Sequence, residues 1–126
     1  MITRFRGLMQ VDRLPGVGVL NGHRFRFTIQ GMVVGSMEIQ LRLEGCNSLK
    51  DKRRILRSLT DRLRREFGVA IAEVDDQDLW GNATVGVACV SNDARHAESV
   101  LQHVLDVFDD CPVVAVDAVA KSVERA

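Results

Sequence analysis

The stretch from Val33 to Gly68, VVGSMEIQLRLEGCNSLKDKRRILRSLTDRLRREFG, carries a strand pattern followed directly by a helix pattern. In its first part apolar and polar side chains alternate, so that Met37, Ile39 and Leu41 fall on one face. A period of two is typical of a strand with one buried face. The sequence therefore predicts a half-buried strand over residues 33–43.

A helix is predicted over residues 49–67, immediately after this strand. Ser48 is a suitable N-cap residue, and Asp51 stands three residues further on as a capping-box partner. Apolar side chains recur on one side at helical spacing, at Leu49, Leu56, Leu59, Leu63 and Phe67. Gly68 then supplies the C-terminal stop, because glycine readily adopts the left-handed conformation that ends a helix.

The same kinds of signal continue from this pair to the C-terminus. Residues 69–74 and 83–90 are short β-branched runs. A helix capped by Asn92 or Asp93 follows, with an apolar stripe from Ala97 to Phe108. A last strand is predicted over residues 113–123. The order β-α-β-β-α-β predicts an α+β, ferredoxin-like sandwich, with a four-stranded antiparallel sheet and two helices on one face. The opposite face would be open and would carry small apolar residues, among them Ala88, Val90, Ala118 and Ala120.

Composition limits the class of protein. The chain has 126 residues, of which 46% are hydrophobic and 27% charged, and its formal net charge is zero. These values are ordinary for one globular domain and exclude a disordered tail, a collagen and a membrane protein. Cys46, Cys89 and Cys111 are odd in number and form no CxxC, which favours free thiols in a reducing compartment. We therefore expect a cytoplasmic protein.

Charge divides the chain into two parts. Residues 1–31 contain five arginines and a single acid, Asp12, for a net charge of +4, and they contain several glycines and a proline. Asn21-Gly22 predicts a hairpin turn between residues 17–20 and 24–29. We expect residues 1–31 to be a basic N-terminal extension, either flexible or the product of a start upstream of the usual one near Met32, and residues 32–126 to be the compact domain. A basic arm could touch nucleic acid, whereas a dispensable tail is the simpler interpretation.

One side of the predicted helix is strongly basic. Residues 48–67 hold eight basic and three acidic residues. The side opposite the leucines carries Lys50, Arg53, Arg54, Arg57, Arg64 and Arg65. Guanidinium groups match phosphate oxygens and release counterions, so this face is a candidate nucleic-acid surface, although a merely solvated helix face has the same composition. Asp61 interrupts the face and is expected to pair with Arg57 or Arg65.

Lys52 is a different case, because it projects towards the apolar side of the helix start. A long alkyl stem can follow the edge of a core there, which favours a structural role.

The segment between the second and third predicted strands is acidic. Glu73, Asp75, Asp76 and Asp78 place four carboxylates within six residues, and hard cations prefer such oxygens. The spacing lacks the glycine and terminal glutamate of a calcium-binding loop, so a solvated hairpin is favoured over a metal site. Trp80 follows directly and either covers the edge of the core or anchors a binding partner.

No catalytic motif is visible in the sequence. His96 and His103 lie about two helical turns apart, too far to hold one ion together. The nucleotide-binding, nucleophile-elbow and zinc-protease motifs are missing. We therefore expect a non-enzymatic protein without a cofactor, a metal or an evident small-molecule substrate.

Three separated motifs resemble one known family. They are Ser48-Leu49-Lys50-Asp51-Lys52-Arg53-Arg54, the run from Ala72 to Trp80, and Val90-Ser91-Asn92-Asp93. Together they are similar to the YlxP-like family, small bacterial proteins classed as a domain of unknown function, over about residues 32–124. The resemblance implies a ferredoxin-like fold, no established enzymatic activity and no family catalytic residues. It also implies a role near RNA or the ribosome, because such proteins are commonly encoded beside translation and ribosome-maturation factors.

Three functions follow as expectations. The first is an RNA- or ribosome-associated accessory protein that uses the basic helix face. The second is a homo-oligomeric interaction module, a homodimer for example, that uses the open sheet face. The third and least favoured is a metal-dependent phosphodiesterase built on Asp75, Asp76 and Asp78.

Overall fold

The computed structural model describes residues 3–4, 10–11, 17–20, 23–26 and 31–126. The chain divides into two compact units, Met1–Gly31 and Met32–Ala126. Within the described part of the chain, no helix combines the length and the apolar character that a membrane span requires.

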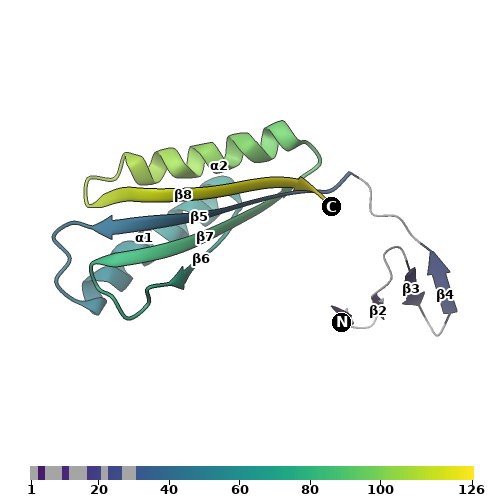
Figure 1. The fold of residues 1–126 in the computed structure, drawn as a ribbon, viewed down its shortest axis with the longest axis horizontal. Helices are drawn as coiled ribbons and strands as arrows, with labels where there is room; N and C mark the ends of the chain where they lie inside the picture. The colour runs from purple at the N-terminus through teal and green to yellow at the C-terminus, as the bar shows by residue number, and fades with distance from the viewer. Residues whose placement is uncertain (1–2, 5–9, 12–16, 21–22, 27–30) are drawn as a thin grey trace. The chain divides into compact units, whose positions relative to one another are not determined.

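The described part of the first unit consists of short antiparallel strands (Figure 1). They are β1 (Thr3–Arg4), β2 (Gln10–Val11), β3 (Val17–Leu20) and β4 (His23–Arg26), in the order β1-β2-β3-β4. Leu20 pairs with His23 at the end of β3 and β4, which confirms the predicted hairpin. Its turn, Asn21-Gly22, lies outside the described residues. The expectation that residues 1–31 are a flexible extension falls largely on residues that are not described and stays a prediction.

The second unit has the predicted order of strands and helices. Its elements are β5 (Val33–Leu43), α1 (Leu49–Phe67), β6 (Ala70–Asp75), β7 (Asn82–Ser91), α2 (Ala94–Asp109) and β8 (Val114–Arg125). The four strands form an antiparallel sheet in the order β6-β7-β5-β8, and both helices lie on the same face of it (Figure 1). This is the predicted α+β, ferredoxin-like arrangement, in which β5-α1-β6 and β7-α2-β8 are split βαβ units.

Local signals fix both ends of α1. Ser48 has an extended backbone, and its Oγ accepts a hydrogen bond from the backbone N–H of Asp51 at 3.1 Å. The Asp51 carboxylate accepts from the backbone N–H of Asn47 rather than from that of Ser48, at 3.4 Å. Gly68 ends the helix in the left-handed conformation, with φ 63°, and donates to the carbonyl of Arg64. The predicted bounds of this helix are therefore confirmed.

The cap of α1 gives a first prediction. Replacing Ser48 with alanine removes the oxygen that satisfies the N–H of Asp51, so the free energy of unfolding should fall by about 1 kcal/mol. Urea denaturation measures this change. Ser58→Ala is the matched control, because Ser58 is exposed within the same helix and alanine favours helix there. An equal loss in both variants would contradict the assignment of the cap.

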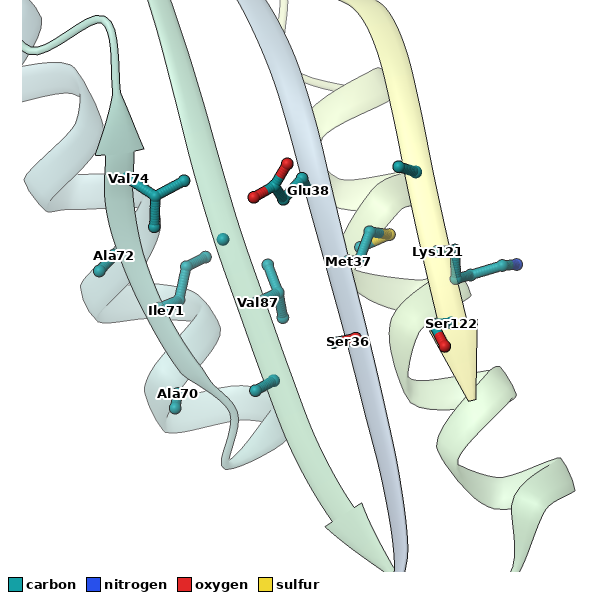
Figure 2. Close-up of a pocket in the computed structure, with 13 residues that line it drawn as sticks. Ser36, Met37, Glu38, Ala70, Ile71, Ala72, Val74, Val87, Lys121 and Ser122 are labelled. Carbon is teal, nitrogen blue, oxygen red and sulfur yellow. The ribbon is translucent and has the colours of Figure 1, made fainter. Parts of the chain in front are cut away.

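The two faces of the sheet differ as the alternation predicts. Every second residue of β5, from Val33 to Leu43, is buried beneath the helices, whereas Ser36, Glu38 and Gln40 are exposed. The register pairs those three residues with Ala88, Gly86 and Thr84 of β7. Figure 2 views the sheet with the helices behind it, so that this uncovered face is towards the reader. Ala88, Val90, Ala118 and Ala120 lie on it, as expected.

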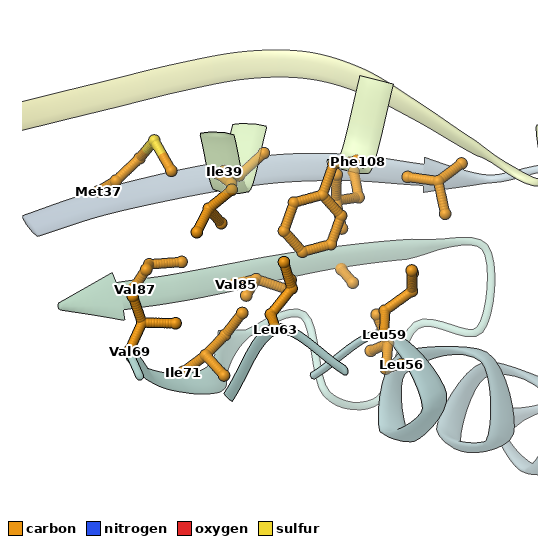
Figure 3. Packing of buried hydrophobic residues seen from close by; sticks show 14 of the residues in the cluster. Met37, Ile39, Leu56, Leu59, Leu63, Val69, Ile71, Val85, Val87 and Phe108 are labelled. Atoms are coloured by element: carbon orange, nitrogen blue, oxygen red, sulfur yellow. The ribbon is translucent and has the colours of Figure 1, made fainter. Parts of the chain in front are cut away.

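A hydrophobic core fills the space between the sheet and the two helices. Ile39 of β5, Val85 of β7, Leu63 of α1 and Phe108 of α2 are all completely buried within it (Figure 3). The core therefore joins all of these elements and holds α1 with its leucines inward.

Candidate nucleic-acid interface

The core determines which side of α1 reaches solvent. Leu56, Leu59 and Leu63 are buried against the sheet, with Lys52 and Thr60 beside them. Five of the six predicted contact residues are exposed and make no bond to the sheet in the described part of the chain: Lys50, Arg53, Arg54, Arg57 and Arg65. We call these five side chains the basic face of α1. It is a row of cations on a rigid helix.

Neighbouring carboxylates neutralise little of the basic face. Arg54 has Asp51 at 3.7 Å, but its side chain is 78% exposed. Among the described residues, no ion pair holds Lys50, Arg53, Arg57 or Arg65. Exposed pairs such as Arg54–Asp51 are worth at most about 1 kcal/mol, so they can exchange for a phosphate.

Arg64, the sixth predicted residue, is held differently. Its Nη1 donates to Asp61 at 3.1 Å and its Nη2 to the backbone carbonyl of Ile71 at 2.7 Å. The predicted pairing of Asp61 with Arg57 or Arg65 is therefore wrong, since the position three residues along the helix is the one occupied. Arg64 braces the helix against the edge strand β6, which leaves its guanidinium less available to an external anion.

Lys52 is 1% exposed, and it holds in place the turn between β6 and β7, which we call the acidic turn. Its ammonium group donates to the backbone carbonyls of Asp76 and Leu79, both at 2.6 Å. Glu73 Oε2 lies 2.6 Å away but without hydrogen-bond alignment, and it has no other partner in the described part of the chain. The predicted structural role of Lys52 is confirmed. No pattern in the sequence indicated that this lysine binds a turn more than twenty residues away.

The carboxylates of this turn point to separate partners. Asp76 adopts φ 63° and accepts from the Thr84 hydroxyl at 2.7 Å, while Asp75 accepts from the backbone N–H of Asp76. Glu73 faces Lys52. Within the described residues, no three acidic, histidine or cysteine side chains converge as a metal site would require. The geometry therefore gives the phosphodiesterase hypothesis no support.

Trp80 and Leu79 follow the turn and face solvent. Their exposed fractions are 51% and 50%, which is high for large apolar side chains. About half of Trp80 is therefore exposed to solvent, and the other half is covered by the protein. Both predicted roles of Trp80, covering the edge of the core and anchoring a partner, stay predictions.

Other reactive side chains lie in structural settings. The ring of His103 stacks on Phe67 at a centroid distance of 6.1 Å, which links the end of α1 to α2. Burial raises the pKa of the Cys89 thiol. A backbone hydrogen bond from Gly35 lowers this pKa, but by less than burial raises it. A raised pKa keeps the thiol protonated and therefore poorly nucleophilic. The sequence pattern did not reveal the His103–Phe67 stack, because the two residues lie on different helices.

Comparison with known proteins identifies a family for most of the second unit. A family described as "Protein of unknown function (DUF503)" matches residues 34–120. The uncharacterized protein YlxP of Bacillus subtilis (strain 168) is 33% identical over 82 residues, which cover 65% of this chain and 89% of that protein. The matched region contains α1, the acidic turn and the whole sheet apart from the ends of β5 and β8. The chain therefore belongs to the DUF503 family of proteins of unknown function.

Proposed function

We propose that this protein is a non-enzymatic, cytoplasmic accessory protein that binds RNA, on the ribosome or its precursors, through the basic face of α1. The observation that carries the proposal is the set of five exposed cations on one helix, Lys50, Arg53, Arg54, Arg57 and Arg65. The chain as a whole is neutral, so this concentration of charge is local. A local excess of arginine on a rigid element favours a polyanionic partner.

The spacing of these cations suits several phosphates rather than one. Lys50 and Arg65 are fifteen residues apart within α1, about 22 Å at 1.5 Å per residue. No aromatic side chain lies within the basic face, so bases have nothing to stack on there. Binding should therefore depend on backbone shape and charge, with strong salt dependence and little sequence preference.

A salt series tests the proposal and is our second prediction. The full chain, titrated with a fragment of structured ribosomal RNA between about 50 and 200 mM salt, should give a log–log slope of roughly −4, because each phosphate contact contributes about −0.7 to −0.9. Replacing Arg54, Arg57 and Arg65 together with alanine should make the slope shallower by about 2 and weaken binding at low salt by at least about tenfold.

The matched control removes three positive charges that lie outside the basic face. Arg42, Arg62 and Lys121 are exposed but lie outside the basic face, and each already contacts a carboxylate. The triple alanine variant of these residues should keep nearly the native slope. Equal loss in both triple variants, or no binding of the native protein at low salt, would rule out the proposal. Co-sedimentation of the native chain with ribosomal particles extends the same test to cells.

The alternative is a homo-oligomer that buries the open sheet face. The exposed small residues of that face favour contact with another protein, and Trp80 offers a further anchor for a partner. A second copy packed centre to centre would, however, bring two Glu38 carboxylates together in an apolar interface, which is costly. For this reason we place RNA binding first.

A further inference from the structure

The uncovered face of the sheet contains a groove of about 630 Å³, and the α1 surface does not contribute to it. Four of its thirteen lining residues are alanines from three strands: Ala70 and Ala72 of β6, Ala88 of β7 and Ala120 of β8. Volumes of roughly 300–1,000 Å³ are typical of clefts that bind a ligand or a short segment. The groove is therefore large enough for more than one side chain.

Glu38 is the exposed carboxylate that lines this groove. Its register partners are Gly86 on β7 and Ala120 on β8, which are among the smallest residues. Its carboxylate leans from β5 towards β7, where Val74 stands on the far side (Figure 2). Because Gly86 and Ala120 have little or no side chain, the Glu38 carboxylate projects beyond an apolar surface formed by its neighbours.

A β-bulge in β6 provides the apolar wall beside Glu38. The register shifts between Glu73 and Asp75, which leaves Val74 unpaired. The Val74 side chain then lies over Gly86, where an added Cβ would come within 2.9 Å of Val74 Cγ1. A side chain at position 86 would therefore displace Val74, which remains 47% exposed as one side of the groove.

The charge of Glu38 is not neutralised within the described residues. Lys121 also lines the groove, but it occupies the register position opposite Met37, whose side chain faces the helices. Its ammonium contacts Glu98 of α2 at 2.5 Å. No ion pair or hydrogen bond engages the Glu38 carboxylate in the described part of the chain. The groove thus presents one negative charge on an apolar surface.

We propose that this groove binds a segment of another protein that carries a lysine or arginine, with the charged end on Glu38 and the alkyl stem on the alanines and Val74. Lysine and arginine each have an apolar stem and a cationic end. The stem suits the apolar surface of the groove, and the cationic end suits the Glu38 carboxylate. Phosphates of RNA or of a membrane would be repelled by Glu38, and a second copy would bring a like charge.

This surface is independent of the proposed RNA contact. The groove lies on the face of the sheet opposite α1, so the two can be occupied together (Figure 1). Failure of RNA binding would leave the groove proposal standing, and the reverse also holds. The two experiments therefore give separate answers.

A pair of peptides tests the groove. One is an acetylated, amidated peptide with a single arginine among leucines and alanines, and the other carries neutral citrulline at that position. In the ¹⁵N-labelled full chain, the arginine peptide should shift the amide signals of residues 36–38, 72–74, 86–88 and 118–122, and should bind about tenfold more tightly than the citrulline peptide. Glu38→Gln should abolish this difference.

Asp109→Asn is the control, because Asp109 is an exposed carboxylate at the end of α2 and away from the groove. It should leave the tenfold preference unchanged. Equal binding of the two peptides, a preference that survives in Glu38→Gln, or shifts confined to α1 would overturn the proposal. So would a dimer in sedimentation equilibrium that Ala120→Trp dissociates, because the face would then be occupied by a second copy.

Discussion

Replacing Lys52 with methionine should lower the free energy of unfolding by about 3–5 kcal/mol, the loss expected when a buried charge loses its partner. Methionine fills a similar volume but donates no hydrogen bond. The carbonyls of Asp76 and Leu79 would lose their donor, and Glu73 Oε2 would be left buried beside an apolar chain. Urea denaturation gives the loss of stability, and the melting temperature should fall by roughly 10 °C or more.

The same variant should release the acidic turn. Lys52 is the contact that ties Asp76 and Leu79 to α1, so without it Trp80 should become more accessible to water. A red shift of the indole emission and stronger quenching by acrylamide would report this opening. If Lys52→Met does not fold, Glu73→Gln keeps the two carbonyl contacts and should show a smaller loss of stability with the turn still in place.

Lys50→Met is the matched control for Lys52→Met. Lys50 is exposed two residues earlier in the same helix, so its replacement should change stability by less than about 0.5 kcal/mol. Because lysine and methionine have nearly equal helix propensities, a comparable loss in both variants would mean that the contact with the turn contributes little.

Lys52 also shows which features of the structure the sequence could predict and which it could not. Its place on the inner side of the helix followed from the period of 3.6 residues, because that period depends on residues within one element. Its ligands did not follow, since they lie on a turn that only the crossover from α1 to β6 brings close. Single-element periodicity carries no information about such contacts.

The same distinction applies to the basic face and to the groove. The helical wheel assigned all six cations to the outer side of α1, and five of them are exposed there without a bond to the sheet. Arg64 differs because the edge of β6 offers the carbonyl of Ile71 to its guanidinium. Predicting the groove requires the register of β5, β7 and β8. A single sequence reveals the alternation of each strand but not this register.

Replacing Phe108 with alanine should cost about 3–5 kcal/mol of stability and is the second large effect that we expect. The ring is completely buried and projects from α2 into the core (Figure 3). Its removal would leave a cavity between the helix and the central strands, where Ile39 and Val85 are also fully buried and have little room to move. Phe108→Leu keeps most of the volume and should cost less than about 1.5 kcal/mol.

Phe108→Leu also separates the fold from the function. It should remain folded under the conditions of the RNA titration, and its side chain lies on α2, away from the basic face. We therefore expect a native salt slope and native affinity from this variant, even though its denaturation midpoint is lower. If a folded Phe108→Leu protein lost RNA binding as completely as the Arg54, Arg57 and Arg65 triple variant, the exposed cations of α1 could not be what holds the RNA.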